Sequence, residues 1–591
     1  MNPALIPWPG KGPSGSQRAS VPLASALLCA LVLAWMPGLP HAGALRLWLM
    51  AAVVPCFALW EGLRPAEGRH LAPWAALAFV LALGAAFRDA PGASLQAAMM
   101  TVGMSAALLL GLRTDRRAPL DVASALAGAL AAAPVWWGSQ SLKGALCHLT
   151  PDLDGCLPTK AEPAAPWWGD GGTFGNPDWL AGFLVLTLIW TTGSLLRTLQ
   201  GAPRRWRLGL LTASGIFQCS ALVALESMGA AVALGAAGAA TALVWGWQKG
   251  PRGKRVAMAG ALALAVGALG ALWSWPSLVE HLQGRAYLWR LSLDVIADGG
   301  LSGVGAGHFH GHFLQAQADW LASNPAQAHL WTNAHHAHNE ALQAAAVHGA
   351  LGLLLLWPLG RAARRTQVSA PWAATTAFWV MAMVSMPLSE PATAWLVAFG
   401  AGVVLRSVER RQRKADAPNT RPRGAGRVWR PLAIAVAAAV LIVGTGNLMG
   451  QRLLVRGVEA RDTVLLERAQ ALMLHPARAR HHLALALLEE DRPGEAMEAA
   501  SAALDADPST ANWVLLGRAA VALGDHQAGI RAFRHAVRLH PQLFAGHFNL
   551  ASTYEGMGDR RTACRHALRA HSLRPTDPRL PNIPSKKACQ R

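Results

Sequence analysis

Long apolar segments constrain this chain more than any other feature of its sequence. Runs of about twenty apolar residues, long enough to cross the hydrocarbon core of a bilayer as a helix, recur thirteen times. Lipid offers the backbone no hydrogen-bonding partners, so segments of this kind span a membrane as helices. The sequence therefore predicts an all-α fold, a polytopic helical membrane protein. The expected spans lie at 21–38, 44–61, 71–87, 93–112, 119–137, 177–196, 207–225, 228–247, 256–276, 341–360, 371–387, 391–407 and 431–450.

The basic residues lie mostly in short strips between these apolar runs. A net charge of +20 could indicate nucleic-acid binding, but 53% of the residues are hydrophobic and only 15% are charged. Nucleic-acid binding needs basic residues clustered on a soluble fold, so we expect no nucleic-acid partner. Cytoplasmic loops carry the excess of lysine and arginine. With the N-terminus cytoplasmic, the cytoplasmic segments hold 27 basic residues, and the opposite side holds six before residue 451.

Five segments follow from the spans and from changes of composition. The first is rich in Pro, Gly and Ser, which predicts disorder. The linker before the last span is strongly basic, and the final 140 residues change to charged, helical sequence. We expect a disordered cytoplasmic N-terminus at 1–20, a membrane domain at 21–405 with a large outer loop at 277–340, a basic cytoplasmic linker at 406–430, a last span at 431–450 and a repeat domain at 451–591.

The C-terminal region carries an internal repeat. Pro508, Pro541 and Pro575 are 33 and 34 residues apart, which is the period of tetratricopeptide repeats. The segment ending at Pro476 resembles the second helix of a degenerate earlier unit. Stacked helix pairs form a concave surface that commonly holds a peptide or a protein, so we expect a protein partner there.

Two pairs of cysteines lie in regions expected outside the cytoplasm. Cys147 and Cys156 share one loop, and Cys564 and Cys589 share the C-terminal tail. Each pair could form a disulfide or remain as free thiols, since sequence does not fix the geometry that a disulfide needs.

The outer loop concentrates arginine and glycine. Arg285 opens an amphipathic helix, and its guanidinium suits a diphosphate that leaves during a reaction. Arg290 follows on the same helix, where it can bind substrate or pair with Asp294. Gly303 and Gly305 could turn backbone amides toward an anion. The loop matches no nucleotide-binding pattern, so we expect no cofactor.

The loop also concentrates histidine. No H-E-x-x-H motif and no nearby carboxylate cluster completes a metal site, so we predict no metal. His335 and His336 are candidate substrate contacts, with ordinary surface histidines as the alternative. His338 and Asn339 lie where the chain re-enters the membrane, and an imidazole there can orient or deprotonate a hydroxyl. The alternative interpretation of this segment is a helix-capping cluster.

Two further carboxylates lie near this outer surface. Glu226 stands in a short turn between two spans, where it either faces the same cavity as the loop or reaches the membrane interface. Asp178 follows Pro177 at the start of the span at 177–196, and we interpret it as a helix cap.

Several of these residues carry a family resemblance. They resemble the signature of the O-antigen ligase and polymerase superfamily over residues 170–405, and the segment GTFGNPDWLAG is similar to one frequent in members that bear repeats. The matching positions are Gly284, Arg285, Trp289, Gly303, Val304, Gly305, His338, Asn339, Leu342, Gly349 and Gly352.

The resemblance implies a metal-independent glycosyltransferase with a multi-helix membrane fold, in the inner membrane of a bacterium. Its donor would be a glycan on undecaprenyl pyrophosphate, and its acceptor a hydroxyl of a glycan, a lipid or a protein. Arg285 would bind the pyrophosphate and His338 would assist the acceptor hydroxyl, with Arg290 a weaker correspondence. The loop and the repeats would be periplasmic.

One departure from the family pattern concerns phosphate binding. The family commonly has Ser-Arg-Gly where this chain has Ser227-Met228-Gly229. A second phosphate-binding arginine is therefore missing, so either Arg290 or the histidines compensate for it, or activity is altered or lost. The alternatives within the superfamily are a polysaccharide polymerase and a protein O-oligosaccharyltransferase. An alternative of another class is a non-catalytic, membrane-anchored repeat scaffold.

Overall fold

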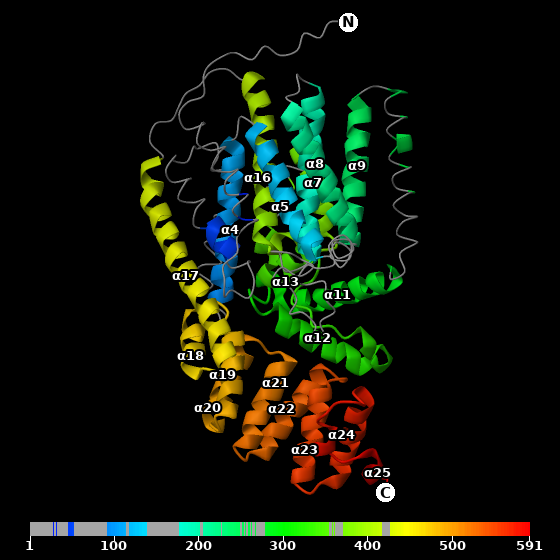
Figure 1. The fold of residues 1–591 in the computed structure, drawn as a ribbon, viewed down its shortest axis with the longest axis vertical. Helices are drawn as coiled ribbons and strands as arrows, with labels where there is room; N and C mark the ends of the chain where they lie inside the picture. The colour runs from blue at the N-terminus through cyan, green and yellow to red at the C-terminus, as the bar shows by residue number, and fades with distance from the viewer. Residues whose placement is uncertain are drawn as a thin grey trace, which may run out of the picture.

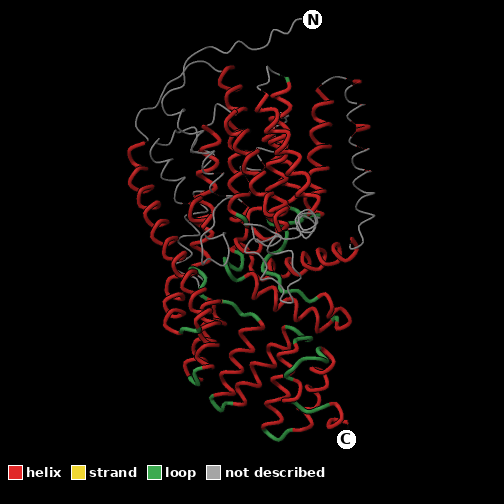
Figure 2. Tube along the Cα trace, viewed as in Figure 1, coloured by secondary structure: helices red, strands yellow, loops and turns green. Residues whose placement is uncertain are grey.

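The computed structural model describes residues 45–51, 91–113, 118–138, 177–200, 205–225, 227–248, 278–353, 370–415 and 426–590, with a few isolated residues between them. All regular structure in these ranges is helical, as predicted, and Figure 2 shows no strand among them. The N-terminal segment 1–20, the expected span 71–87 and most of 21–38 and 256–276 lie outside the described residues.

The apolar helices form one bundle above the outer loop and the repeats (Figure 1). Small residues allow its helices to approach closely, as is usual in lipid. A Cβ on Gly111 of α4 would overlap the Phe399 carbonyl oxygen of α16, and one on Gly402 would overlap the Leu108 carbonyl oxygen. The bundle comprises α4 (Pro91–Arg113), α5 (Ala118–Gly138), α7 (Pro177–Leu199), α8 (Arg205–Ala224), α9 (Met228–Gln248), α15 (Ala370–Ala382) and α16 (Pro391–Ala415).

The number of spans is smaller in the structure than in the prediction. Among the described residues, four helices are long and apolar enough to cross a membrane, not about thirteen. Several of the other expected spans fall on shorter apolar helices or outside the described residues. The span expected at 341–360 is interrupted at Gly349, whose φ of 58° is left-handed. The four candidate spans are Leu95–Leu112, Asp178–Leu199, Arg205–Ala224 and Ala437–Ala460.

The last apolar helix differs most from its predicted bounds. α17 (Gly426–Ala460) is a single helix of 35 residues. It therefore includes the end of the expected linker and continues ten residues past the boundary predicted at 450. Hydropathy falls at that boundary, but no proline follows it, so the helix continues until Arg461, whose φ of 53° ends it.

The outer loop folds into three helical pieces at the end of the bundle. α11 (Leu278–Gly299) runs across the bundle in Figure 1, and α12 (Phe309–Ser323) lies between it and the repeats. The short η2 (Gly300–Ser302) and η3 (Pro325–Leu330) connect these helices, and α13 (Glu340–Gly352) returns toward the bundle. The first of these helices begins at Leu278 and the last at Glu340, and the loop bounds of 277–340 stay a prediction.

The C-terminal region stacks into helix pairs with the predicted repeat period. Three aspartates each cap the second helix of a pair by accepting a backbone N–H from its first turn: Asp462, Asp525 and Asp559. The pairs are α19 (Ala477–Glu489) with α20 (Pro493–Ala506), α21 (Thr510–Ala522) with α22 (His526–Leu539), and α23 (Phe544–Gly556) with α24 (Arg560–Leu573).

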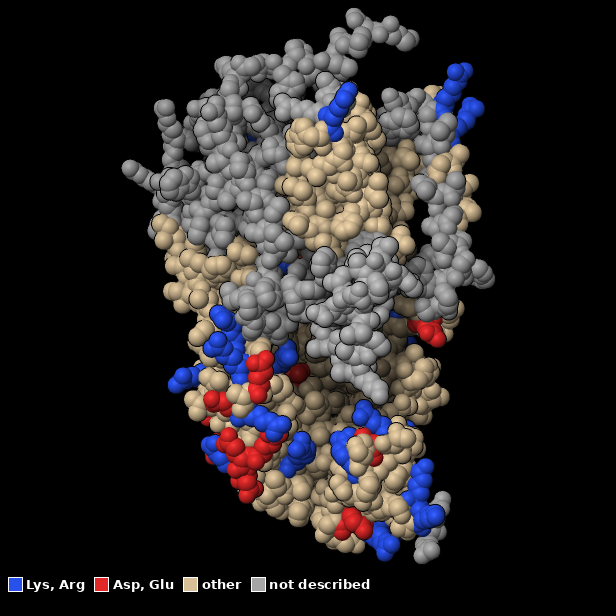
Figure 3. Space-filling model, in the orientation of Figure 1, with Lys and Arg blue, Asp and Glu red and all other residues tan. Residues whose placement is uncertain are grey.

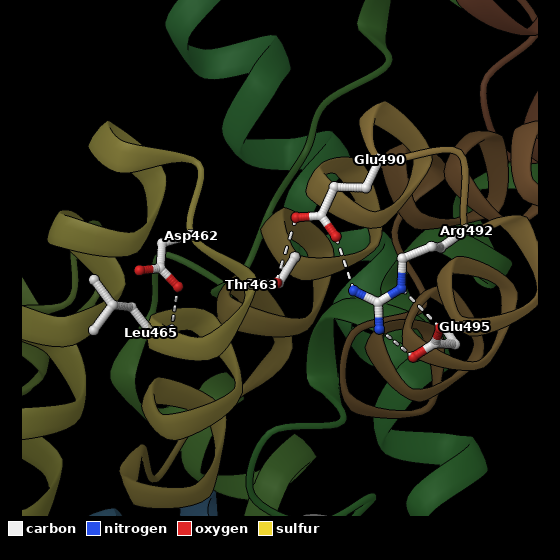
Figure 4. Close-up of polar contacts among 6 residues, drawn as sticks. All are labelled: Asp462, Thr463, Leu465, Glu490, Arg492 and Glu495. Carbon is white, nitrogen blue, oxygen red and sulfur yellow. Dashed lines mark hydrogen bonds and ion pairs between the residues drawn. The ribbon is translucent and has the colours of Figure 1, made fainter.

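The degenerate earlier unit is also present. α18 (Thr463–Leu472) packs against the end of α17, which supplies the first helix of that unit. Figure 4 shows how it meets the next pair: Thr463 donates a hydrogen bond to Glu490, and the guanidinium of Arg492 bridges Glu490 and Glu495. These side chains are exposed, so their ion pairs add little to the stability of the fold.

A disulfide closes the end of the repeat domain. Cys564 on α24 is bonded to Cys589 on the short terminal helix α25 (Lys586–Gln590), with their Cα atoms 5.3 Å apart. This settles one of the two cysteine pairs that the sequence left open. Cys147 and Cys156 lie outside the described residues.

Candidate functional site

A polar cluster lies where the bundle meets the outer loop. Asp178 is in the first turn of α7, and Ser227 directly precedes α9. The Ser227 hydroxyl donates a hydrogen bond to Asp178 Oδ1 at 2.9 Å. The same hydroxyl oxygen accepts from the N–H of Ala230 in the first turn of α9, so one side chain joins the ends of two bundle helices.

Arg285 of α11 belongs to this cluster. Its side chain is half-buried, and burial lowers the pKa of the guanidinium, while the Asp178 carboxylate acts to raise that pKa. An arginine remains charged under such conditions because its ordinary pKa is above 12. The cluster thus holds a partly desolvated positive charge beside a carboxylate.

His338 is the second predicted catalytic residue, and the structure places it close enough to Arg285 for the two to interact electrostatically. Burial, with smaller effects of Arg285 and His336, lowers the pKa of His338 to about 4, and the Asp178 carboxylate opposes this shift. The imidazole is therefore neutral near pH 7 and can accept a proton. The backbone of His338 has a φ of 49°, a strained value for a residue with a side chain.

The residues that follow His338 hold it in this position. Asn339 Oδ1 accepts the N–H groups of Ala341 and Leu342 at the start of α13, and Asn339 Nδ2 donates to the Met383 carbonyl. The buried carboxylate of Glu340 accepts the N–H of Leu388. Asn339 was predicted to bind substrate, but these bonds use its amide group to cap α13, as the alternative interpretation expected.

The two glycines of the loop serve close packing. A Cβ on Gly303, whose φ is 69°, would lie 2.5 Å from the nitrogen of Gly349. The N–H of Gly305 donates to the Val347 carbonyl at 2.9 Å. The anion-binding amide predicted at Gly305 is therefore occupied by a hydrogen bond to α13 within the protein.

His335 and His336 have different surroundings. The His335 ring is exposed and stacks on the buried His310 ring with centroids 3.9 Å apart, and His310 Nε2 lies 3.7 Å from Asp507 of the repeats. His336 lies between this stack and His338. Burial lowers its pKa to about 4, with smaller effects of His335 and His310, and its Nδ1 is buried without a hydrogen bond.

The remaining predicted residues are not brought into the cluster. Arg290 is exposed and lines a different hollow, formed by α11, α12 and η3. Glu226 lies outside the described residues. Asp178 is the residue that the sequence interpretation missed, because a carboxylate in the first turn of a helix is usually a cap. In the described ranges, no three histidine, cysteine, aspartate or glutamate side chains converge as metal ligands.

The repeats contact the segment that leads to His338. The Trp331 ring lies flat against His540, with centroids 3.6 Å apart, and its Nε1 donates to the Leu539 carbonyl at 2.9 Å. Leu314 and Ala318 of α12 pack against Leu539. The end of α22 therefore supports the outer loop seven residues before His338.

Comparison with protein families identifies the repeats. Residues 511–543, which comprise α21 and α22, match the tetratricopeptide repeat family. No curated protein matches the chain. The repeat prediction is therefore confirmed, and the chemistry of the membrane domain rests on its geometry and on the sequence resemblance.

Proposed function

We propose that this protein transfers a glycan from an undecaprenyl-pyrophosphate donor to an acceptor hydroxyl. The observation that carries the proposal is the pairing of Arg285 with a neutral His338 in one polar cluster. The sequence resemblance assigns diphosphate binding to the first and acceptor activation to the second. The two residues are 53 positions apart in the chain, and they come from different helical segments.

The proposed reaction needs a base and a counter-charge. The acceptor oxygen attacks the anomeric carbon, the bond from that carbon to the diphosphate oxygen breaks, and the hydroxyl proton passes to His338. Arg285 offsets the charge of the departing diphosphate. A bound diphosphate would also offset the effect of Arg285 on the imidazole. The pKa of His338 would then rise toward neutrality, where a general base is most effective.

Three features support an outer-face location. Figure 3 shows basic side chains at the end of the bundle away from the repeats, where α7 ends near Arg197 and α8 begins at Arg205. This is the distribution expected if that end is cytoplasmic. The disulfide of the repeats is typical of an oxidising compartment, and four helices are suited to span a membrane. These features support our proposal that the cluster and the repeats are periplasmic.

Met228 reduces the positive charge that this site can offer to a diphosphate. It follows Ser227 at the start of α9, so the arginine common in the family at this position would lie beside the same cluster. In this chain the proposed diphosphate site contains Arg285 and no arginine at 228. A Met228→Arg variant is a direct way to ask whether the site tolerates the second charge.

The test is transfer in membrane vesicles with a labelled lipid-linked glycan. We expect His338→Ala and Arg285→Ala each to abolish transfer while the protein still inserts. Controls are His526→Ala and Arg518→Ala, exposed residues of the repeats, which should retain wild-type turnover. Wild-type product from either cluster variant would disprove the proposed roles. The product separates the alternatives, since a polymerase lengthens the glycan and an oligosaccharyltransferase labels protein.

The repeats favour a second candidate, a non-catalytic scaffold for envelope assembly. Their stacked pairs offer a surface for a protein partner, and the methionine at 228 weakens the case for catalysis. If the protein is a scaffold, cells that carry the His338→Ala variant should show the wild-type phenotype. A transferase would lose it.

A further inference from the structure

An open hollow lies on the outer loop and is lined in part by α11, the helix that also carries Arg285. It has a volume of about 450 Å³ and is bounded by α11, α12 and η3. One wall is aromatic: Trp320 packs edge to face on Tyr287, with ring centroids 5.0 Å apart. The Tyr287 hydroxyl donates to Gln317, which also accepts the N–H of Thr332. These contacts hold the aromatic wall in place without a ligand.

Four of the other lining residues are polar and have no partner among the described residues, and the last two, Ala286 and Leu330, are apolar. In the described part of the chain, the side chains of Gln283, Arg290, Gln327 and His329 make no hydrogen bond or ion pair, although all four border the hollow. None of the residues that line it is a carboxylate. The hollow therefore offers two amides, an imidazole and a guanidinium around an indole ring.

This combination is suited to sugar rings. The apolar face of a pyranose can stack on an indole, while amide and imidazole groups exchange hydrogen bonds with its hydroxyls. A guanidinium binds a carboxylate through two parallel hydrogen bonds. We propose that this hollow is a binding subsite for a glycan that carries an acidic sugar, with Trp320 as the stacking platform and Arg290 as the carboxylate ligand.

The position of the hollow relates it to the proposed transfer site, and to that extent this inference rests on the proposed function. Arg285 and Arg290 are five residues apart on α11, which separates them by about 140° around the helix and about 7.5 Å along it. The diphosphate and the acidic glycan would therefore be held on different sides of one helix. The exposed stripe of Val279, Leu282 and Leu293 lies between these sides.

The test measures binding of defined oligosaccharides to the full chain in nanodiscs. The probes are a tetragalacturonate and a neutral tetrasaccharide of the same length. Saturation-transfer NMR measures the binding of each probe. We expect the acidic probe to bind more tightly to the wild type. Arg290→Gln should weaken binding of the acidic probe about tenfold, equivalent to about 1.4 kcal/mol. It should leave binding of the neutral probe nearly unchanged. Trp320→Ala should weaken both probes about two- to tenfold.

Matched controls separate this site from general effects. Trp206→Ala on α8 and Arg518→Gln on α21 change exposed residues of the same types elsewhere and should leave binding unchanged. His338→Ala should also leave it unchanged, so that failed transfer and failed glycan binding are distinguishable. Equal binding of the two probes, no binding to the wild type, or full binding to Arg290→Gln would overturn the proposal. Arg290 is exposed, so its substitution does not threaten folding.

Discussion

At the scale of single residues, the unusual environment of His338 makes stability depend on pH. Its pKa is about 4 in the folded chain, below the ordinary value of about 6.5. As the pH falls, the unfolded chain takes up this proton first. The stabilisation from the neutral imidazole is therefore complete above about pH 6.5 and lost between about 6.5 and 4.

We expect the thermal unfolding midpoint to fall over this pH range, and to fall less in His338→Gln. His336 has a similarly lowered pKa, so the variant should reduce the slope without removing it. An exposed histidine on α22, changed in His526→Gln, is the control. If the midpoint of His338→Gln falls with pH as steeply as that of the wild type, the pKa of His338 is not lowered in the folded chain.

Residue types predicted which side chains gather in the loop better than they predicted the hydrogen bonds that each residue makes. Arg285 and His338 were selected because guanidinium and imidazole suit a diphosphate and a hydroxyl, and the structure places them in one cluster. Gly305 and Asn339 were also selected on chemistry, but their polar groups are used inside the protein. Such internal partners depend on tertiary contacts, which one sequence does not reveal.

At the scale of elements, the contact between the loop and α22 has a strong part and a weak part. Trp331 stacks on His540 and donates to Leu539. The nearby pair of Asp319 and Arg538 is 2.9 Å apart but highly exposed. Truncation of a half-buried tryptophan to alanine lowers the free energy of unfolding by about 2 kcal/mol, roughly half of the loss at a fully buried site. An exposed ion pair contributes at most about 1 kcal/mol.

Trp331→Ala should therefore loosen the loop from the repeats, and Arg538→Gln should not. Hydrogen exchange of α12 and α22 measures this directly, with faster exchange expected only in the tryptophan variant. Trp206→Ala controls for loss of an exposed indole. A larger effect from Arg538→Gln would mean that charge, and not the stacked ring, holds the contact.

The helix bounds match the predicted bounds where an apolar run ends at a turn, and they differ from the prediction elsewhere. The helices α5, α7, α8 and α9 begin and end within two or three residues of the expected spans. α17 runs on beyond its apolar stretch because helix formation does not require an apolar sequence. α13 is interrupted at Gly349, where a left-handed backbone lies against Leu301 and Gly303, and hydropathy does not detect such a contact.

At the scale of the whole molecule, the repeats support the proposed site without contributing to it. Asp178, Ser227, Arg285 and His338 all come from the membrane domain and its loop. The repeats hold Trp331, seven residues before His338, through His540 and Leu539. Removing the repeats should therefore disorder the approach to the cluster and leave its chemical groups present.

Deletion of residues 477–591 tests this division, because it keeps α18 packed on the end of α17. We expect the shortened chain to insert normally and to transfer glycan about tenfold more slowly in the vesicle assay. Trp331→Ala in the full chain should reproduce much of that decrease, since it removes the same contact. Complete loss of transfer on deletion, with full activity in Trp331→Ala, would instead mean that the repeats deliver the acceptor through a bound partner.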